Sequence, residues 1–138
     1  MTQNTVSDQA GINLLIQQFF SLFNNKITAS PDLDAIYNLC LPEAIIIKKN
    51  GLEESIYDLG SFITPRQQIL SDGTLTDFEE FEISHETTVF QHIAQRHSKY
   101  QKKGVSEGKE FTGSGTKFFH LLKTSQGWKI SSVIWEDD

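Results

Sequence analysis

Residues that could carry chemistry gather in the second half of the chain, and His85 is the first of them. Residues 78–90 alternate between a mostly apolar set and a mostly acidic set, as a half-buried strand does. The apolar set predicts the inner face and includes His85, where an imidazole could act as a general base near neutral pH or bind a ligand. A core histidine bonded to a neighbouring carbonyl or hydroxyl is the simpler interpretation. The inward set is Phe81, Ile83, His85 and Val89, and the outward set is Glu80, Glu82, Ser84 and Glu86.

Arg96 and Tyr100 lie four residues apart in the next expected strand and therefore share a face with Ala94. Alternation alone does not decide whether this face is the inner one. In a dry pocket the arginine would have to bind a carboxylate, either of a ligand or of the protein. The tyrosine hydroxyl could donate to a ligand oxygen. On the outer face both side chains would simply be solvated.

Four further residues are candidates for the lining of a cavity. His120 has the same parity as Phe118 and Leu122, which predicts that it points inward, although a structural histidine is the simpler interpretation. Two tyrosines could reach a cavity from the helical side but could equally be packing, and a tryptophan could line the pocket mouth or a dimer contact. These aromatic candidates are Tyr37, Tyr57 and Trp135.

The sequence gives no sign of a metal or cofactor. Neither His-X-His nor His-Glu-X-X-His occurs, and His92 and His97 have opposite parity on one strand. The segment Gly113-Ser-Gly-Thr-Lys117 lacks the spacing of a phosphate-binding loop and leads into a strand. We therefore expect no metal and no cofactor.

The composition indicates a single soluble domain spanning residues 1–138. A net charge of -6 disfavours nucleic acid and anionic membranes as partners. The single cysteine, Cys40, excludes an internal disulfide and fits a reducing compartment. Because the N-terminus lacks a signal-peptide pattern and no apolar run could span a bilayer, we expect a cytoplasmic protein.

Helices precede strands along the chain. A long amphipathic helix follows the capping pair Ser7-Asp8, a second helix is expected from Ser30 to Pro42, and a third from Tyr57 to Leu70, where Pro65 should interrupt it. This order predicts an α+β domain with its helices on one face of a sheet. The strands are expected at 44–48, 78–90, 93–102, 116–123 and 128–136, with a tight turn at Gln91-His92 and a glycine-rich loop over 104–115.

Several segments occur in an order found in one known superfamily. They are the helix Ile12–Phe23 with a short strand after it, Phe62-Ile-Thr-Pro-Arg66 leading into Leu70-Ser-Asp-Gly73, the hairpin Val89–Ala94, and Gly127-Trp128-Lys-Ile130. With these segments the chain resembles, over nearly its whole length, the nuclear transport factor 2-like superfamily. The resemblance is to its polyketide-cyclase-like and ketosteroid-isomerase-like branch.

This resemblance implies a cone-shaped, cystatin-like α+β fold. A curved antiparallel or mixed sheet would wrap around the long N-terminal helix, with a pocket at the wide end and dimers formed through the outer sheet face. It also favours an inward Ala94, and hence an inward Arg96 and Tyr100. The sequence departs from the isomerase pattern of an aspartate base beside a tyrosine and a protonated aspartate. No acidic residue is predicted on an inner strand face.

The function that we infer from the sequence is the binding of a small organic ligand in an apolar pocket, with Arg96 and Tyr100 as polar anchors. One alternative is a cyclase- or isomerase-like proton transfer with His85 as base and Tyr100 or Arg96 steadying an oxyanion. Another is a non-catalytic association module that docks through the outer sheet face. We also expect a homodimer if the protein is a ligand-binding domain.

Overall fold

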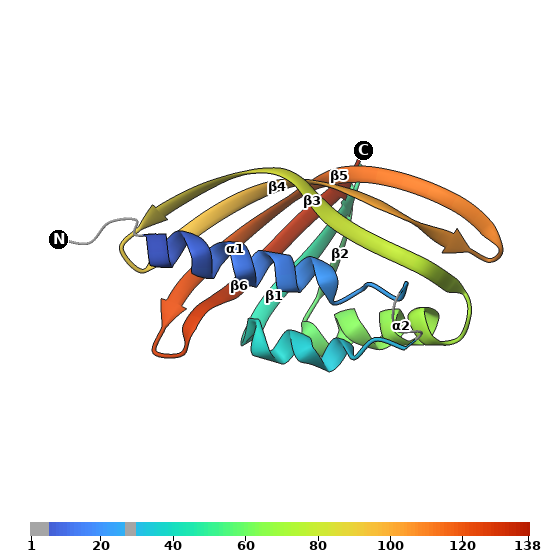
Figure 1. Cartoon of the computed structure of the whole chain (residues 1–138), viewed down its shortest axis with the longest axis horizontal. Helices are drawn as coiled ribbons and strands as arrows, with labels where there is room; N and C mark the ends of the chain where they lie inside the picture. Colours follow the sequence, from blue (N-terminus) through green and yellow to red (C-terminus); the bar gives the residue numbers. More distant parts are fainter. Residues whose placement is uncertain (1–5, 27–29) are drawn as a thin grey trace.

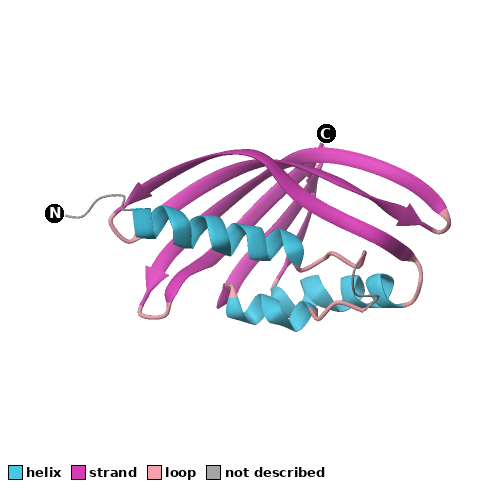
Figure 2. Ribbon diagram, viewed as in Figure 1, coloured by secondary structure: helices cyan, strands magenta, loops and turns pink. Residues whose placement is uncertain are grey.

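One curved six-stranded sheet with all its helices on the concave side makes up the fold (Figures 1 and 2). The computed structural model describes residues 6–26 and 30–138. The first five residues, on which part of the expectation about a signal peptide rests, lie outside this range. The helices are α1 (Val6–Ser21), the 3-10 helix η1 (Leu33–Asn38) and α2 (Leu59–Ser71). The strands are β1 (Cys40–Asn50), β2 (Glu53–Tyr57), β3 (Leu75–Phe90), β4 (Ile93–Ser106), β5 (Lys109–Thr124) and β6 (Gly127–Asp137).

The strand order is β2-β1-β6-β5-β4-β3, and only the β1–β6 pair is parallel in the described part of the chain. The first long strand therefore lies beside the last one, and only β2 separates this pair from one edge of the sheet. This arrangement confirms the predicted α+β class with a mixed sheet. Within the described residues, no helix combines the length and the apolar character needed to cross a membrane.

Helix α1 lies lengthwise under the arch formed by β3, β4 and β5 (Figure 1). Its apolar residues recur every three or four positions, so one face is buried against the sheet. Phe19 meets the ring of Phe119 edge to face, with 5.5 Å between the ring centroids. The buried residues of this face are Ile12, Leu15, Ile16, Phe19 and Phe20, and Phe23 just after the helix is buried as well.

Strand β3 changes the face that each parity presents, because its register with β4 shifts between Glu82 and Ser84. Before the shift the even-numbered Glu80 and Glu82 point to the concave side, where Glu80 pairs with Lys117 and Glu82 with Arg96. After the shift the odd-numbered His85 does so, opposite the buried Ser98. The prediction that both glutamates face solvent is wrong, as is the inward placement of two apolar neighbours. Those neighbours, Phe81 and Ile83, are exposed on the convex side.

The glycine-rich segment 104–115 is not a loop but the continuation of two strands. Strands β4 and β5 run on to a two-residue turn at Glu107-Gly108, where both residues have positive φ. Gly115 is instead required by close packing, since a Cβ there would lie 2.6 Å from the carbonyl oxygen of Glu136 and 2.7 Å from Cζ of Tyr100. The tight turn predicted at Gln91-His92 is confirmed.

The second and third helices also differ from expectation. The second is a single short 3-10 segment, and the residues expected at its end, Cys40 and Pro42, belong to β1. Strand β1 is thus longer than the predicted 44–48, and β2 was not predicted. Helix α2 runs through Pro65 without interruption. A capping box between Asp58 and Ser61 fixes its first turn.

Candidate ligand-binding site

A cavity of about 270 Å³ opens where α1 ends, between the helices and the concave side of the sheet. Helices α1 and α2 form one wall, and residues from β1, β3, β4, β5 and β6 form the other. Its apolar lining is mostly aromatic, which suits a flat organic molecule of about one or two rings. The aromatic lining residues are Phe19, Phe23, Phe62, Phe78, Phe111 and Trp135.

Asn25 joins the three segments that surround this cavity. Its amide nitrogen donates to the carbonyl oxygens of Leu70 (3.1 Å) at the end of α2 and Leu75 (2.7 Å) at the start of β3. Its amide oxygen accepts from the backbone N–H of Phe78 at 2.7 Å. Because Asn25 is buried and satisfied at both ends of its amide, it holds the end of α1, the end of α2 and β3 in a fixed relation.

Lys117 and Glu80 form a buried ion pair in the cavity wall. Their charged atoms are 3.3 Å apart, and only 5% and 10% of the two side chains are exposed. The ammonium also lies 4.3 Å from the ring centroid of Tyr100 and 4.6 Å from that of Trp135. Burial lowers the pKa of Lys117, and the carboxylate of Glu80 opposes this shift.

A second polar cluster, around Asp137 near the end of β6, lies beside the first. Asp137 accepts a short hydrogen bond from the hydroxyl of Tyr100 and a charged one from Lys102 at 2.9 Å, and Lys48 lies 3.9 Å away. Burial and the neighbouring carboxylate raise the pKa of Tyr100, so its hydroxyl keeps its proton at neutral pH. Tyr100 is fully buried and its hydroxyl is already engaged. Lys48 and Lys102 line the cavity.

Arg66, on α2, brings a cation to the cavity from the helical side. Its guanidinium lies 4.0 Å from the ring centroid of Phe62 and 5.2 Å from that of Tyr57. One guanidinium nitrogen donates to the carbonyl oxygen of Phe62, one turn earlier, at 3.0 Å. The arginine is thus held against aromatic rings in a defined position.

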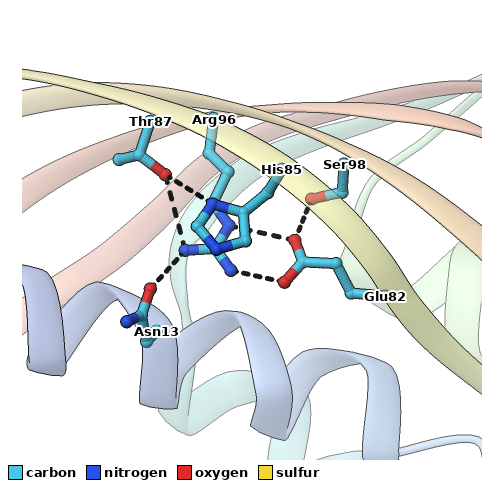
Figure 3. Close-up of polar contacts among 6 residues, drawn as sticks. All are labelled: Asn13, Glu82, His85, Thr87, Arg96 and Ser98. Carbon is cyan, nitrogen blue, oxygen red and sulfur yellow. Dashed lines mark hydrogen bonds and ion pairs between the residues drawn. The ribbon is translucent and has the colours of Figure 1, made fainter.

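Arg96 does point to the concave side, but protein groups surround its guanidinium (Figure 3). Glu82 binds it through both carboxylate oxygens, at 3.0 Å and 2.5 Å, and Asn13 of α1 accepts from it at 2.6 Å. Ser98 donates to the same carboxylate at 2.5 Å. This cluster joins α1 to β3 and β4, and Arg96 is not among the residues that line the cavity.

Several solved structures superpose on nearly the whole chain. One is a nuclear transport factor 2-like superfamily protein from Salmonella enterica (TM-score 0.79, 14% identity, 97% of this chain and 93% of the other). Another is a protein of unknown function with a cystatin-like fold from Nostoc punctiforme (TM-score 0.76, 14% identity, 99% and 96%).

This chain has the nuclear transport factor 2-like fold. A candidate aromatic ring hydroxylase from Novosphingobium aromaticivorans has it too (TM-score 0.70, 15% identity, 98% of this chain and 92% of the other). No protein-family model matches the sequence, and no curated protein matches it significantly. At these identities the likeness describes the fold, and the function must be argued from the site.

In this nuclear transport factor 2-like fold, the residues singled out from the sequence are scattered. His85 and Arg96 both approach the hydroxyl of Thr87, at 3.4 Å each, but His85 is exposed. His120 is exposed on the convex side, so its predicted inward orientation is wrong. Tyr37 is exposed on η1, and Tyr57 lies beside Arg66. Trp135 lines the cavity, as one of its two interpretations had it.

The charged residues of the cavity were missed. Glu80 was assigned to the wrong face because a register shift within a strand leaves no mark in the alternation pattern. Lys117 was considered only as the end of a glycine-rich segment. Its shared parity with Phe119 and Leu121 was the signal that could have placed it on an inner face. Arg66 contributed to the resemblance, but its role in a pocket follows only from the packing of α2.

Proposed function

We propose that this protein binds a small organic ligand in the cavity between α1, α2 and the sheet. The observation that carries the proposal is the combination of an aromatic lining with charged side chains held in fixed positions around it. Such a mixture is typical of sites that bury an apolar body and orient it by a few polar contacts. The polar contacts come from Arg66, Lys102 and the Glu80–Lys117 pair, while Arg96 and Tyr100 are occupied by Glu82 and Asp137.

Trp135 provides a direct test, because it lines the cavity whereas Trp128 packs near the start of α1 and donates to Asp8. With Trp128→Phe as background, titration with small aromatic compounds should quench Trp135 saturably and raise Tm. Thr74→Phe, which places a large side chain in the cavity wall without adding a second tryptophan, should abolish both effects, and Thr88→Phe, on the opposite sheet face, should leave them intact. Binding that survives Thr74→Phe unchanged would show that the ligand sits elsewhere.

Proton transfer on such a ligand is a second candidate function, and the observation that favours it is the position of Glu80. This carboxylate lines the cavity beside Lys117, so a bound molecule can come within reach of a base. His85, the base proposed from the sequence, does not line the cavity. If chemistry occurs, Glu80→Gln should abolish turnover of a bound carbon acid although the folded variant still binds it, whereas His85→Gln should leave the rate unchanged.

We also propose that the protein is a cytoplasmic homodimer formed through the convex sheet face. A row of apolar side chains crosses that face from β1 through β6 to β5, where Ile47, Ile134 and Phe118 are register neighbours. Ile134 is 41% exposed and Phe118 57%. A second copy related by a two-fold axis would cover the row in both molecules and bury on the order of 1,200–2,000 Å². Light scattering should give a dimer that Phe118→Lys converts to a monomer; a wild-type monomer at high concentration would refute this.

A further inference from the structure

The charges around the cavity do not balance. Its lining includes four cations, Lys48, Arg66, Lys102 and Lys117, but only one carboxylate, that of Glu80. This excess of positive charge occurs in a protein whose net charge is -6, so it is a local feature of the cavity and not of the whole surface. A concave site with low-dielectric walls focuses such a field on whatever enters it.

Two carboxylates neutralise part of this charge. Glu80 pairs with Lys117 at 3.3 Å. Asp137, just outside the lining, pairs with the other two sheet lysines of the cavity, Lys102 at 2.9 Å and Lys48 at 3.9 Å. One positive charge therefore remains uncompensated on the sheet side of the cavity.

Arg66 supplies the second uncompensated charge. Among residues 6–26 and 30–138, no carboxylate lies within 4.0 Å of its guanidinium. It is half-buried, and it donates to the backbone carbonyl of Phe62. Burial lowers the pKa of Arg66, while the hydroxyl of Tyr57 and the more distant carboxylate of Glu80 oppose this shift. Arg96 shows the contrast, since Glu82 binds it through both oxygens.

We propose that the cavity selects an organic anion, in which a carboxylate binds Arg66 and a flat apolar body packs against Phe62 and Trp135. A guanidinium binds a carboxylate through two parallel hydrogen bonds, and the aromatic rings beneath Arg66 already hold its plane in place. The sheet lysines add a long-range attraction for the same charge. This inference rests on the proposed ligand-binding function and gives it a chemical class.

Matched pairs of probes separate the class of ligand from the existence of the site. Isothermal titration calorimetry would compare each of three carboxylates with its neutral amide: benzoate with benzamide, 2-naphthoate with 2-naphthamide, and indole-3-acetate with indole-3-acetamide. At least one carboxylate should bind about tenfold or more tightly than its amide. Arg66→Gln should remove that preference while amide binding changes less than about twofold. Arg66→Lys should restore only part of the preference, because an ammonium lacks the planar fork.

Lys99→Gln is the matched control, since it removes one positive charge from the exposed convex side. It should leave carboxylate affinity within about twofold of wild type. If amides bind as tightly as carboxylates, or if Arg66→Gln keeps the preference, the anion proposal is overturned and the binding function stands. If no member of any pair binds at millimolar concentration, both proposals fall. Circular dichroism and Tm of Arg66→Gln would confirm that the variant is folded.

Discussion

Glu82→Gln should destabilise the protein strongly, although Glu82 does not line the proposed cavity. The substitution removes the negative charge that both oxygens present to Arg96, whose side chain is only 2% exposed. Removing one partner of a buried ion pair costs about 3–5 kcal/mol, because the other charge remains buried and unpaired. Glu82 itself is 18% exposed and glutamine still accepts one hydrogen bond, so we expect the lower end, about 3 kcal/mol.

The assay is equilibrium urea unfolding, with thermal unfolding as a second readout. For a domain of this length the unfolding entropy is about 0.3 kcal/mol/K, so a loss of about 3 kcal/mol lowers Tm by about 10 °C. Glu54→Gln is the control, since the Lys49–Glu54 pair has a comparable distance, 2.9 Å, but side chains that are 31% and 52% exposed. It should cost less than about 1 kcal/mol.

A double-mutant cycle gives the sharper result. Glu82→Met combined with Arg96→Met should cost at least about 2 kcal/mol less than the two single substitutions together, since neither charge is then left alone. If the two losses simply add, the guanidinium and carboxylate are not coupled. The interpretation of Arg96 as a residue held by Glu82, and not free to bind ligand, would then be wrong.

Three further outcomes follow from the packing and the titrating groups. Gly115→Ala should cost at least about 2 kcal/mol in urea unfolding, because the new Cβ would overlap Tyr100 and the carbonyl oxygen of Glu136. Gly60→Ala is the control: its Cβ would lie 3.7 Å from the nearest atom, so it should be neutral or slightly stabilising. Burial raises the pKa of the Cys40 thiol from 9.0 to about 12, so a thiol reagent should react with it far more slowly in native than in unfolded protein. The free energy of unfolding should also fall as pH rises above 9, because the thiol ionises first in the unfolded chain. Equal reaction rates in the two states would contradict this burial. Burial lowers the pKa of Lys117 in the folded protein, so between this pKa and the ordinary value of 10.5 the unfolded chain binds more protons than the folded one. The contribution of this residue to stability therefore rises with pH in that range. Lys117→Met should reduce the slope of the urea unfolding midpoint against pH. An unchanged slope would mean that burial does not perturb this lysine.

The sequence predicted the class of fold because its strongest patterns are local. The three- and four-residue spacing in α1 and the alternation in the late strands follow from helix and strand geometry alone. The sheet face that Glu80 and Glu82 occupy is set by the register shift that inserts one residue between Glu82 and Ser84. Nothing in the apolar pattern marks that insertion, since Phe81 and Ile83 are apolar but exposed on the convex side.

The glycines of 104–115 misled for a related reason. Glycine signals a flexible turn only when the backbone needs its freedom, as at Gly108, where φ is 83°. At Gly115 the missing side chain makes room for the ring of Tyr100, a reason that appears only once β4 and β5 are paired. The candidate site was found only in part, because Arg66, Glu80 and Lys117 meet through tertiary packing and are far apart in sequence.

The parallel contact between β1 and β6 affects the order in which the protein folds. Strand β1 pairs only with β2 and β6 in the described chain, so the β1–β2 hairpin has no ladder to the remaining strands until β6 has been synthesised. Closing that long loop is entropically unfavourable and should make docking of the hairpin a late, slow event. Until then the edge of β1 that pairs with β6 has no partner and is open to water and to chaperones. The cavity, which takes Lys48 from β1 and Trp135 from β6, is therefore among the last features of the molecule to form.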